Sequence, residues 1–310
     1  MLDFHKLFSG IEFTLKGTQK KLEVESAVGV YYGINSDGNY RLAFMSPCEA
    51  YQLTSTKLLS VTYGRESDKV YWTCFDLTQP VAKNVFYTFC GDMVSAIIGV
   101  VHVSDALRII KNRFNTWKSL FKKDVGQVSA EVLKGLFGEL YFLKNYMIPK
   151  YGVKDAVMSW SGPDDTHKDF SVNLDWYEVK TIDVGAITVK ISSIQQLSSD
   201  VPGRLEIIKV ENMSAEYNDG ECCIIQLFEN ILSKIADDDV RDYFISHVTS
   251  FGFAFTDEVF QIRYKVVSVN GYRVEGTFPR VTEKEVPYPE IGKLTYELII
   301  NMMDQYKEEE

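Results

Sequence analysis

Residues 168–181 of the chain read KDFSVNLDWYEVKT, and this stretch decides the fold prediction. Two runs of strand-forming residues flank the turn sequence NLD at 173–175, so the stretch predicts an antiparallel β-hairpin. Residues two apart in a strand share a face, so Glu178 and Lys180 project together. Asp169, at the start of the first strand, then comes opposite or diagonal to Glu178, about 5–8 Å away.

This grouping of charges predicts a metal-dependent site. Two carboxylates at that separation repel each other unless a cation lies between them, and oxygen ligands favour Mg²⁺ or Mn²⁺. Lys180, beside the pair, can hold or polarise a water molecule. Such a set is typical of metal-assisted phosphodiester hydrolysis. The alternative is a solvated hairpin face, because Glu-x-Lys is a common pattern.

The residues before the hairpin predict a helix over 129–143. Ser129 is a suitable N-cap, and apolar residues recur behind it at helical spacing. Gly135 and Gly138 each cost roughly 1 kcal/mol of helix propensity relative to Ala. Two glycines at this spacing indicate close approach to another element, often a sheet. Glu139 lies at the edge of the apolar stripe, where a carboxylate needs a partner or a function.

The segments around the hairpin complete a pattern. Residues 156–160 predict a strand before the hairpin, and 186–191 form a short apolar segment after it. A helix through Leu197 follows, opened by Ser192 or Ser193, and Ser192 with Gln195 fits a capping box. A strand over 205–210 comes next. The order is therefore helix, three strands, helix, strand.

The rest of the chain divides into parts of different character. Before residue 91, alternating residues and turn signals predict a β-rich module, with strands near 11–15, 21–25, 28–34, 40–44, 58–63, 70–75 and 85–90. Residues 91–123 have helical spacing, and 108–123 is the most basic stretch. The last third predicts a helix over 223–248, a hairpin of 260–267 and 272–278, and a helix over 294–306. The expected domains are 1–90, a helical linker 91–125, a core 126–212 and an α/β extension 213–310.

Composition narrows the class of protein. The chain has 310 residues, a formal net charge of −10 and 45% hydrophobic residues, which is typical of a folded soluble protein. No apolar run is long enough to span a membrane, and the start resembles no signal peptide. The five cysteines include no Cys-x-x-Cys pair, which argues against a zinc ribbon and favours a reduced, cytoplasmic protein.

The order of elements together with Asp…Glu-x-Lys resembles the PD-(D/E)XK nuclease superfamily, whose core is αβββαβ. The chain is most similar to a bacterial group of candidate members of that superfamily. The motifs that carry the resemblance are GLFGEL at 135–140, WSGP at 160–163, HKDF at 167–170, YEVKT at 177–181 and ISS at 191–193 through Gln196-Leu197. The resemblance therefore implies an α+β protein, with a β-rich N-terminal module, a restriction-endonuclease-like core and an α/β C-terminal extension.

The resemblance also implies roles for residues. Asp169, Glu178 and the main-chain carbonyl of Val179 would ligate Mg²⁺ or Mn²⁺, and Lys180 would orient the attacking water. Glu139 would ligate through water or bind a second ion. Gln196, with Gln195 as the less favoured neighbour, would support the site from the following helix.

Two features depart from the pattern that the resemblance implies. The Pro-Asp of the superfamily name could be Pro163-Asp164, but Asp169 is preferred because it can face Glu178 across the hairpin. Lys168 separates His167 from Asp169, so His167 is interpreted as a surface residue, with a phosphate or site contact as the alternative.

The leading hypothesis is a Mg²⁺-dependent DNA endonuclease of restriction or phage defence, with the basic stretch 108–123 supplying part of the phosphate-binding surface. Cutting both strands would need a homodimer or sequential nicking. A second hypothesis is a catalytically silent core that binds DNA or serves in a defence complex. A third is a soluble α+β interaction protein with a coincidental motif.

Overall fold

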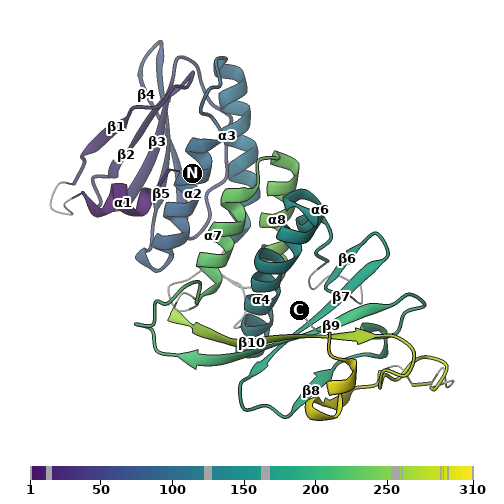
Figure 1. The fold of residues 1–310 in the computed structure, drawn as a ribbon. Coiled ribbons are helices and arrows are strands. Elements are labelled where there is room, and N and C mark those ends of the chain that lie inside the picture. Colours follow the sequence, from purple (N-terminus) through teal and green to yellow (C-terminus); the bar gives the residue numbers. More distant parts are fainter. Residues whose placement is uncertain are drawn as a thin grey trace. The chain divides into compact units, whose positions relative to one another are not determined.

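The computed structural model describes residues 2–11, 16–121, 128–161, 168–252, 259, 261–286, 288, 290, 291 and 293–308. The chain forms two compact units (Figure 1), each described here by itself. The first comprises Met1–Gln127 with Gly252–Glu258, and the second comprises Val128–Phe251 with Val259–Glu310.

The first unit is an antiparallel sheet covered by helices. Its strands, in the spatial order β1-β2-β3-β5-β4, are β1 (Gln19–Leu22), β2 (Gly29–Ile34), β3 (Tyr40–Ser46), β5 (Val70–Leu77) and β4 (Leu59–Ser67). Its helices are α1 (Phe4–Ser9), α2 (Lys83–Ser95) and α3 (Val103–Trp117), with 3₁₀ turns η1 (Pro80–Ala82) and η2 (Lys118–Phe121). Phe75 contacts rings from both long helices, Phe89 of α2 and Phe114 of α3. The core of this unit therefore lies between the sheet and α2 and α3.

One expectation for the first unit fails, and the expected role of the basic stretch 108–123 stays a prediction in which Arg113 has no part. The predicted strand 85–90 is wrong because it lies inside α2, whose residues from Val85 to Met93 are all buried. A helix buried on every side carries no polar stripe to reveal its period. In the basic stretch, Arg113 is only 4% exposed and lies 3.4 Å from Asp92, so its charge serves the core and not a phosphate surface. The predicted strand 11–15 falls mainly outside the described residues.

The second unit contains a mixed sheet with strand order β10-β9-β7-β6. Its strands are β6 (Phe170–Val172), β7 (Asp175–Asp183), β9 (Gly203–Met213) and β10 (Arg263–Val274). β7 and β9 are parallel, whereas β6–β7 and β9–β10 are antiparallel. β8 (Thr188–Ile191) pairs instead with β11 (Tyr296–Ile299). The remaining turns are η4 (Ile194–Gln196), η5 (Ile300–Met302) and η6 (Asp304–Tyr306).

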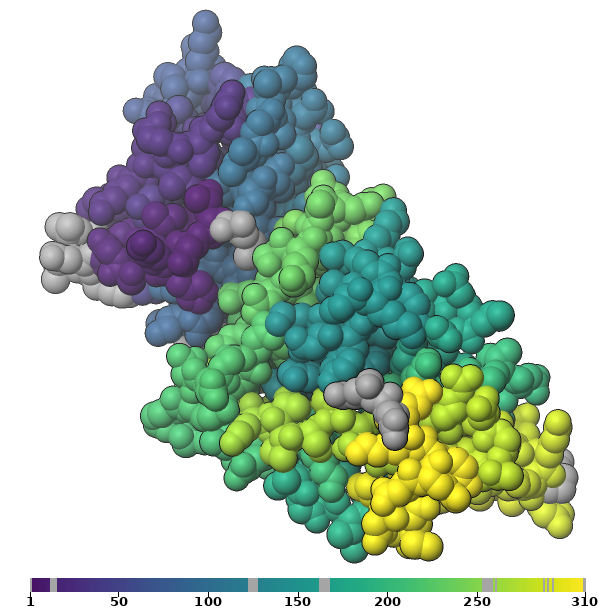
Figure 2. Space-filling model, viewed as in Figure 1, coloured from purple at the N-terminus to yellow at the C-terminus, as the bar shows by residue number. Residues whose placement is uncertain are grey.

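Helices of the second unit form a layer of their own. They are α4 (Ala130–Phe142), the π-helical turn η3 (Leu143–Met147), α5 (Ile148–Tyr151), α6 (Val153–Met158), α7 (Ile224–Lys234) and α8 (Asp238–Ser250). α4 contacts α7, and α6 contacts α8, so the teal and green surfaces in Figure 2 are continuous. Among the described residues, no helix is long and apolar enough to span a membrane.

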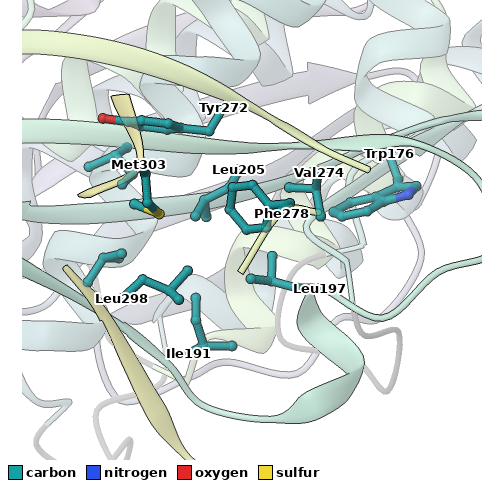
Figure 3. Close-up of a cluster of buried hydrophobic side chains, with 11 residues drawn as sticks. Trp176, Ile191, Leu197, Leu205, Tyr272, Val274, Phe278, Leu298 and Met303 are labelled. Carbon is teal, nitrogen blue, oxygen red and sulfur yellow. The ribbon is translucent and has the colours of Figure 1, made fainter. Parts of the chain in front are cut away.

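One hydrophobic cluster joins the sheet to the β8–β11 ribbon (Figure 3). It combines Trp176 of β7, Leu205 of β9 and Val274 of β10 with Ile191 of β8 and Leu298 of β11. Because the ribbon contributes buried side chains to this cluster, its position against the sheet is fixed by burial of apolar surface. The ribbon also leads directly into η4, so the cluster fixes that turn as well.

Several local predictions for the second unit are wrong, although the α+β class is confirmed. Residues 153–158 form α6, and only Trp160 makes a single bridge, to Phe170. The predicted helix at 192–197 is the one turn η4, and the predicted final helix begins as β11. Helix 223–248 is two helices, because Asp237 caps the second through its side chain. The observed order after α4 is η3, α5 and α6, then three strands, a 3₁₀ turn and a strand.

The predicted hairpin of 260–278 is one continuous strand, β10, which pairs with β9 along its length. The Asn270-Gly271 turn signal is overridden by this pairing. Gly271 has a different use: a Cβ placed there would lie 3.0 Å and 3.2 Å from the carboxylate oxygens of Glu206. The glycine therefore leaves room for a neighbouring side chain.

Candidate functional site

The β6–β7 hairpin brings Asp169 and Glu178 together. Its register pairs Phe170 with Tyr177, so the next pair outward is Asp169 and Glu178. Asp169 precedes the strand, and its Oδ2 accepts a hydrogen bond of 2.6 Å from the backbone N–H of Val179. A strand residue directs its N–H and its carbonyl to the same edge. The Val179 carbonyl therefore faces the Asp169 side as well.

Glu178 and Lys180 form the buried part of the site. Glu178 is 1% exposed, and its Oε1 lies 2.6 Å from Lys180 Nζ. Its other oxygen, Oε2, has no hydrogen-bond partner among the described residues. Burial lowers the pKa of Lys180, but Glu178, Asp169 and Glu139 outweigh it, and the net shift is upward. Lys180 is therefore a protonated ammonium beside a buried acid.

Glu139 reaches the same group of charges from α4. Trp160 Nε1 donates to its Oε2 at 2.7 Å, and Trp160 is itself fully buried against the ring of Phe170. Burial and then Asp169 raise the pKa of Glu139 well above its usual value, against the Trp160 hydrogen bond. Trp160 is therefore a core residue that also fixes this carboxylate.

The site holds three acids and one amine in a poorly hydrated region. Burial raises the pKa of Asp169 against the opposing effects of Lys180 and the Val179 N–H. Burial and then Asp169 raise the pKa of Glu178 to about 8, while Lys180 opposes the shift. Lys168 also acts on Asp169 and Glu178, but two ammonium groups do not compensate three carboxylates, so the group favours protons or a further cation.

This imbalance predicts a pH-dependent stability difference between wild type and Glu178→Gln. The folded pKa of Glu178 lies above its usual value of 4.5, so the folded state retains the proton more strongly. Its contribution to stability therefore falls as pH rises from about 4.5 to about 8. In metal-free buffer, thermal unfolding should show Glu178→Gln gaining stability relative to wild type between pH 5 and pH 8. A constant difference across that range would contradict the shift.

Gln196 lies in turn η4 and uses its side chain locally. Its Oε1 accepts a hydrogen bond of 2.7 Å from Ser192 N, so this contact replaces the predicted capping box of Ser192 and Gln195. Gln195 Nε2 lies 3.5 Å from Glu283 Oε1. Within the described part of the chain, no hydrogen bond joins the Gln196 side chain to Glu139, Asp169, Glu178 or Lys180. The structure therefore places Gln196 in the supporting turn and brings the other four together.

Sequence reasoning missed Lys168. Its ammonium donates to the main-chain oxygens of Gln195, Gln196 and Ser198 at 2.6, 2.7 and 3.1 Å. The same nitrogen lies 4.0 Å from the ring centroid of Trp176. Because Lys168 adjoins Asp169, it ties η4 to the hairpin. Three carbonyls on a distant turn leave no local signal in the sequence, so the pattern around Lys168 could not reveal this role.

Some predicted residues cannot be placed. Pro163, Asp164 and His167 lie outside the described residues. Among the residues that are described, no three Asp, Glu, His or Cys side chains are grouped as a ready-made metal site. The arrangement is thus two facing carboxylates with a backbone carbonyl at the same edge, and a third acid held by Trp160.

Comparison with known proteins identifies the family. A family model described as "Putative PD-(D/E)XK family member" matches residues 6–301. The chain belongs to this family. No curated protein and no solved structure matches the chain. The family assignment agrees with the mixed α+β fold of the structure, which is consistent with a nuclease-like fold. Proteins of the PD-(D/E)XK superfamily are usually nucleases that use divalent metals.

Proposed function

We propose that the chain is a divalent-metal-dependent endonuclease that hydrolyses phosphodiester bonds of DNA. The observation that supports this most strongly is the hairpin register that sets Asp169 opposite the buried Glu178, with Lys180 Nζ 2.6 Å from Glu178. An exposed hairpin face, the plain alternative for these charges, would leave Glu178 in solvent, whereas it is 1% exposed.

The donor groups suit a hard cation. Glu178 Oε2 is buried without a hydrogen-bond partner in the described chain, which is costly for a carboxylate. Asp169 uses one oxygen for the Val179 N–H, and no described hydrogen bond reaches Oδ1. We propose that Asp169, Glu178 and the Val179 carbonyl hold Mg²⁺ or Mn²⁺, and that Glu139 contributes through water or a second ion. A bound ion would supply charge neutralisation at the phosphate and activation of water.

The chain's own residues would position the reactants. Lys180 stays protonated, because the surrounding carboxylates raise its pKa, so it can donate to the attacking water and to phosphate oxygens. Trp160 occupies Oε2 of Glu139 and leaves Oε1 to accept a hydrogen bond from water. Gln196 would hold η4 in shape through Ser192, and Lys168 would keep that turn against the hairpin.

We further propose that the chain acts on duplex DNA in restriction or phage defence, as a homodimer or with partner proteins. A second candidate is a catalytically silent core that binds DNA or serves in a defence complex. One observation favours it: no ready-made metal site is grouped among the described residues, and Lys180 already contacts Glu178.

Supercoiled plasmid distinguishes the two candidates. With Mg²⁺ or Mn²⁺, wild type should nick or linearise the plasmid, EDTA should stop the reaction, and Asp169→Asn should lose activity. Mn²⁺ should also raise the unfolding temperature of wild type and not of Asp169→Asn. Salt-dependent DNA binding without cleavage under any divalent metal would support the silent core instead, and activity insensitive to EDTA would refute the proposed site.

A further inference from the structure

Two cations from outside the turn η4 hold its main chain. Lys168 donates to three of the four consecutive carbonyl oxygens of residues 195–198, and Arg280 Nη1 donates to the fourth, that of Leu197, at 2.9 Å. The carbonyls of this turn therefore face two positive side chains. Because Lys168 adjoins Asp169, the contacts of the turn link Arg280 to the proposed metal site.

Arg280 follows a segment that is anchored in the core. Phe278, two residues earlier, is 3% exposed and belongs to the hydrophobic cluster that includes Leu197 and Trp176 (Figure 3). The ammonium of Lys168 lies 4.0 Å from the ring centroid of the same tryptophan. Burial of Phe278 therefore holds the backbone of Arg280 against the turn that its guanidinium contacts.

Tyr296 of β11 connects this segment to the acids of the site. Its hydroxyl accepts a hydrogen bond of 3.4 Å from the N–H of Val281, the residue after Arg280. Burial raises the pKa of Tyr296, the Val281 N–H and Arg280 oppose the shift, and Glu285 and Glu178 add to it. Arg280 and Glu178 therefore lie close enough to one hydroxyl for the charge of each to act on it.

Most hydrogen-bond donors of Arg280 are unused. A guanidinium has five N–H groups, and Arg280 uses one of them for the carbonyl of η4. Although Arg280 is partly buried, no acid among the described residues forms an ion pair with it. Glu283 and Glu285, on the same segment, contact the Gln195 amide and the Thr282 N–H instead. The planar fork of a guanidinium matches two oxygens of a phosphate.

Lys168 cannot take the same ligand. An ammonium has three N–H donors, and three main-chain oxygens accept from this one. Burial lowers the pKa of Lys168 to about 8, Arg280 adds to the shift, and Glu178 and Asp169 oppose it. Two cations that repel each other across one turn favour an anion beside them, and Arg280 is the one with donors to offer.

We propose that Arg280 binds a backbone phosphate of DNA beside the metal site, through the N–H groups that do not bond Leu197. The inference rests on the proposed nuclease function, because a divalent ion would compensate the neighbouring acids and leave the charge of Arg280 available to DNA. The contacts from Arg280 to Asp169 pass through η4 and Lys168. The phosphate is therefore a neighbour of the scissile phosphate, and Arg280 would position the strand.

Binding of a short labelled DNA duplex tests the inference without requiring cleavage. Fluorescence anisotropy is measured with Mn²⁺ in the Lys180→Ala background, which keeps the proposed metal ligands. Adding Arg280→Gln removes a charge and keeps an N–H donor for Leu197. It should weaken binding by about threefold to tenfold and reduce the slope of log affinity against log salt concentration by about one. Adding Arg280→Lys keeps the charge and should keep the slope.

Cleavage kinetics separate phosphate binding from support of the turn. In the otherwise wild-type chain, Arg280→Gln should raise KM for plasmid and leave kcat within about twofold. A role limited to the shape of η4 would lower kcat instead, because Lys168 and Asp169 would shift with the turn. Arg273→Gln is the matched control, because this arginine of the same unit pairs with Glu275 and Glu308, and it should bind and cleave as its parent does.

The outcomes distinguish this inference from the proposed function. An unchanged slope in Arg280→Gln, an equal loss in Arg273→Gln, a fall of kcat alone, or no duplex binding by the parent protein would overturn the phosphate contact. If Arg280→Gln changes the slope but wild type cleaves under no divalent metal, the nuclease proposal fails and the contact stands. If wild type cleaves and Arg280→Gln binds as its parent does, the nuclease proposal stands and the contact fails.

Discussion

Lys180→Ala is expected to reduce metal-dependent DNA cleavage by roughly 10²–10³-fold, the loss typical of removing one preorganised group that stabilises a transition state. The ammonium lies 2.6 Å from Glu178 Oε1, and it opposes the raised pKa of both Asp169 and Glu178 more strongly than Lys168 does. Without Lys180, the attacking water loses a hydrogen-bond donor. The negative charge that develops on the phosphate in the transition state also loses the positive charge that stabilises it. Initial rates of plasmid nicking at saturating Mg²⁺ measure the effect.

Lys134→Ala is the matched control for this substitution. Lys134 lies on α4 and pairs with Asp183 at the end of β7, at 2.7 Å, so the variant removes a lysine of the same unit that pairs with a different acid. It should cleave plasmid at about the wild-type rate. Mn²⁺-dependent stabilisation should persist in Lys180→Ala, because the proposed ligands remain. Equal cleavage rates for wild type and Lys180→Ala would show that Lys180 has no part in the reaction.

The proximity of Asp169, Glu178 and Lys180 in the candidate site could be predicted from the sequence because the three residues lie on one hairpin. Alternation along a strand decides that Glu178 and Lys180 share a face, and the short NLD turn decides that Asp169 faces Glu178. Both rules are local, so they needed no knowledge of the rest of the fold. Ser129 likewise caps α4 as its sequence predicts, with its side chain accepting from Val132 N.

The errors arose where tertiary contacts decide the outcome. Val85 to Met93 form a helix that is apolar all round, so periodicity could not distinguish it from a strand. Asn270-Gly271 has the chemistry of a turn, but pairing with the long strand β9 keeps the chain extended. Two of the support contacts around the site, from Trp160 and Lys168, join side chains to groups on a helix or a turn that no local pattern predicts.

Glu206 is a second acidic residue that the sequence places inside an apolar strand. A charged residue between Leu205 and Ile207 interrupts an apolar strand, as Glu178 does in β7. In both strands the flanking apolar residues are buried, and Glu178 and Glu206 are themselves only 1% and 7% exposed. An acid inside a predicted core strand therefore indicates a candidate site, although its ligand depends on side chains from other elements.

Gly138→Ala should destabilise the second unit by about 1–3 kcal/mol, the usual cost of overpacking. A Cβ at position 138 would lie 1.7 Å from Thr181 Oγ1 and 2.9 Å from Thr181 Cβ, so α4 and β7 must separate. Glu139 is the next residue on α4. If α4 moves away from β7, Glu139 moves away from Asp169 and Glu178. Chemical denaturation measures the stability change, and cleavage should fall together with it.

Gly135→Ala is the control that tests whether the effect of Gly138→Ala comes from the contact with Thr181. It introduces the same methyl group one turn earlier on the same helix, where a Cβ would meet nothing within 4 Å. Helix propensity alone should then stabilise the protein by about 1 kcal/mol. The two glycines thus predict opposite signs for an identical substitution. If Gly138→Ala also stabilises the protein, α4 does not approach β7 as closely as this structure has it, and the placement of Glu139 at the site fails with it.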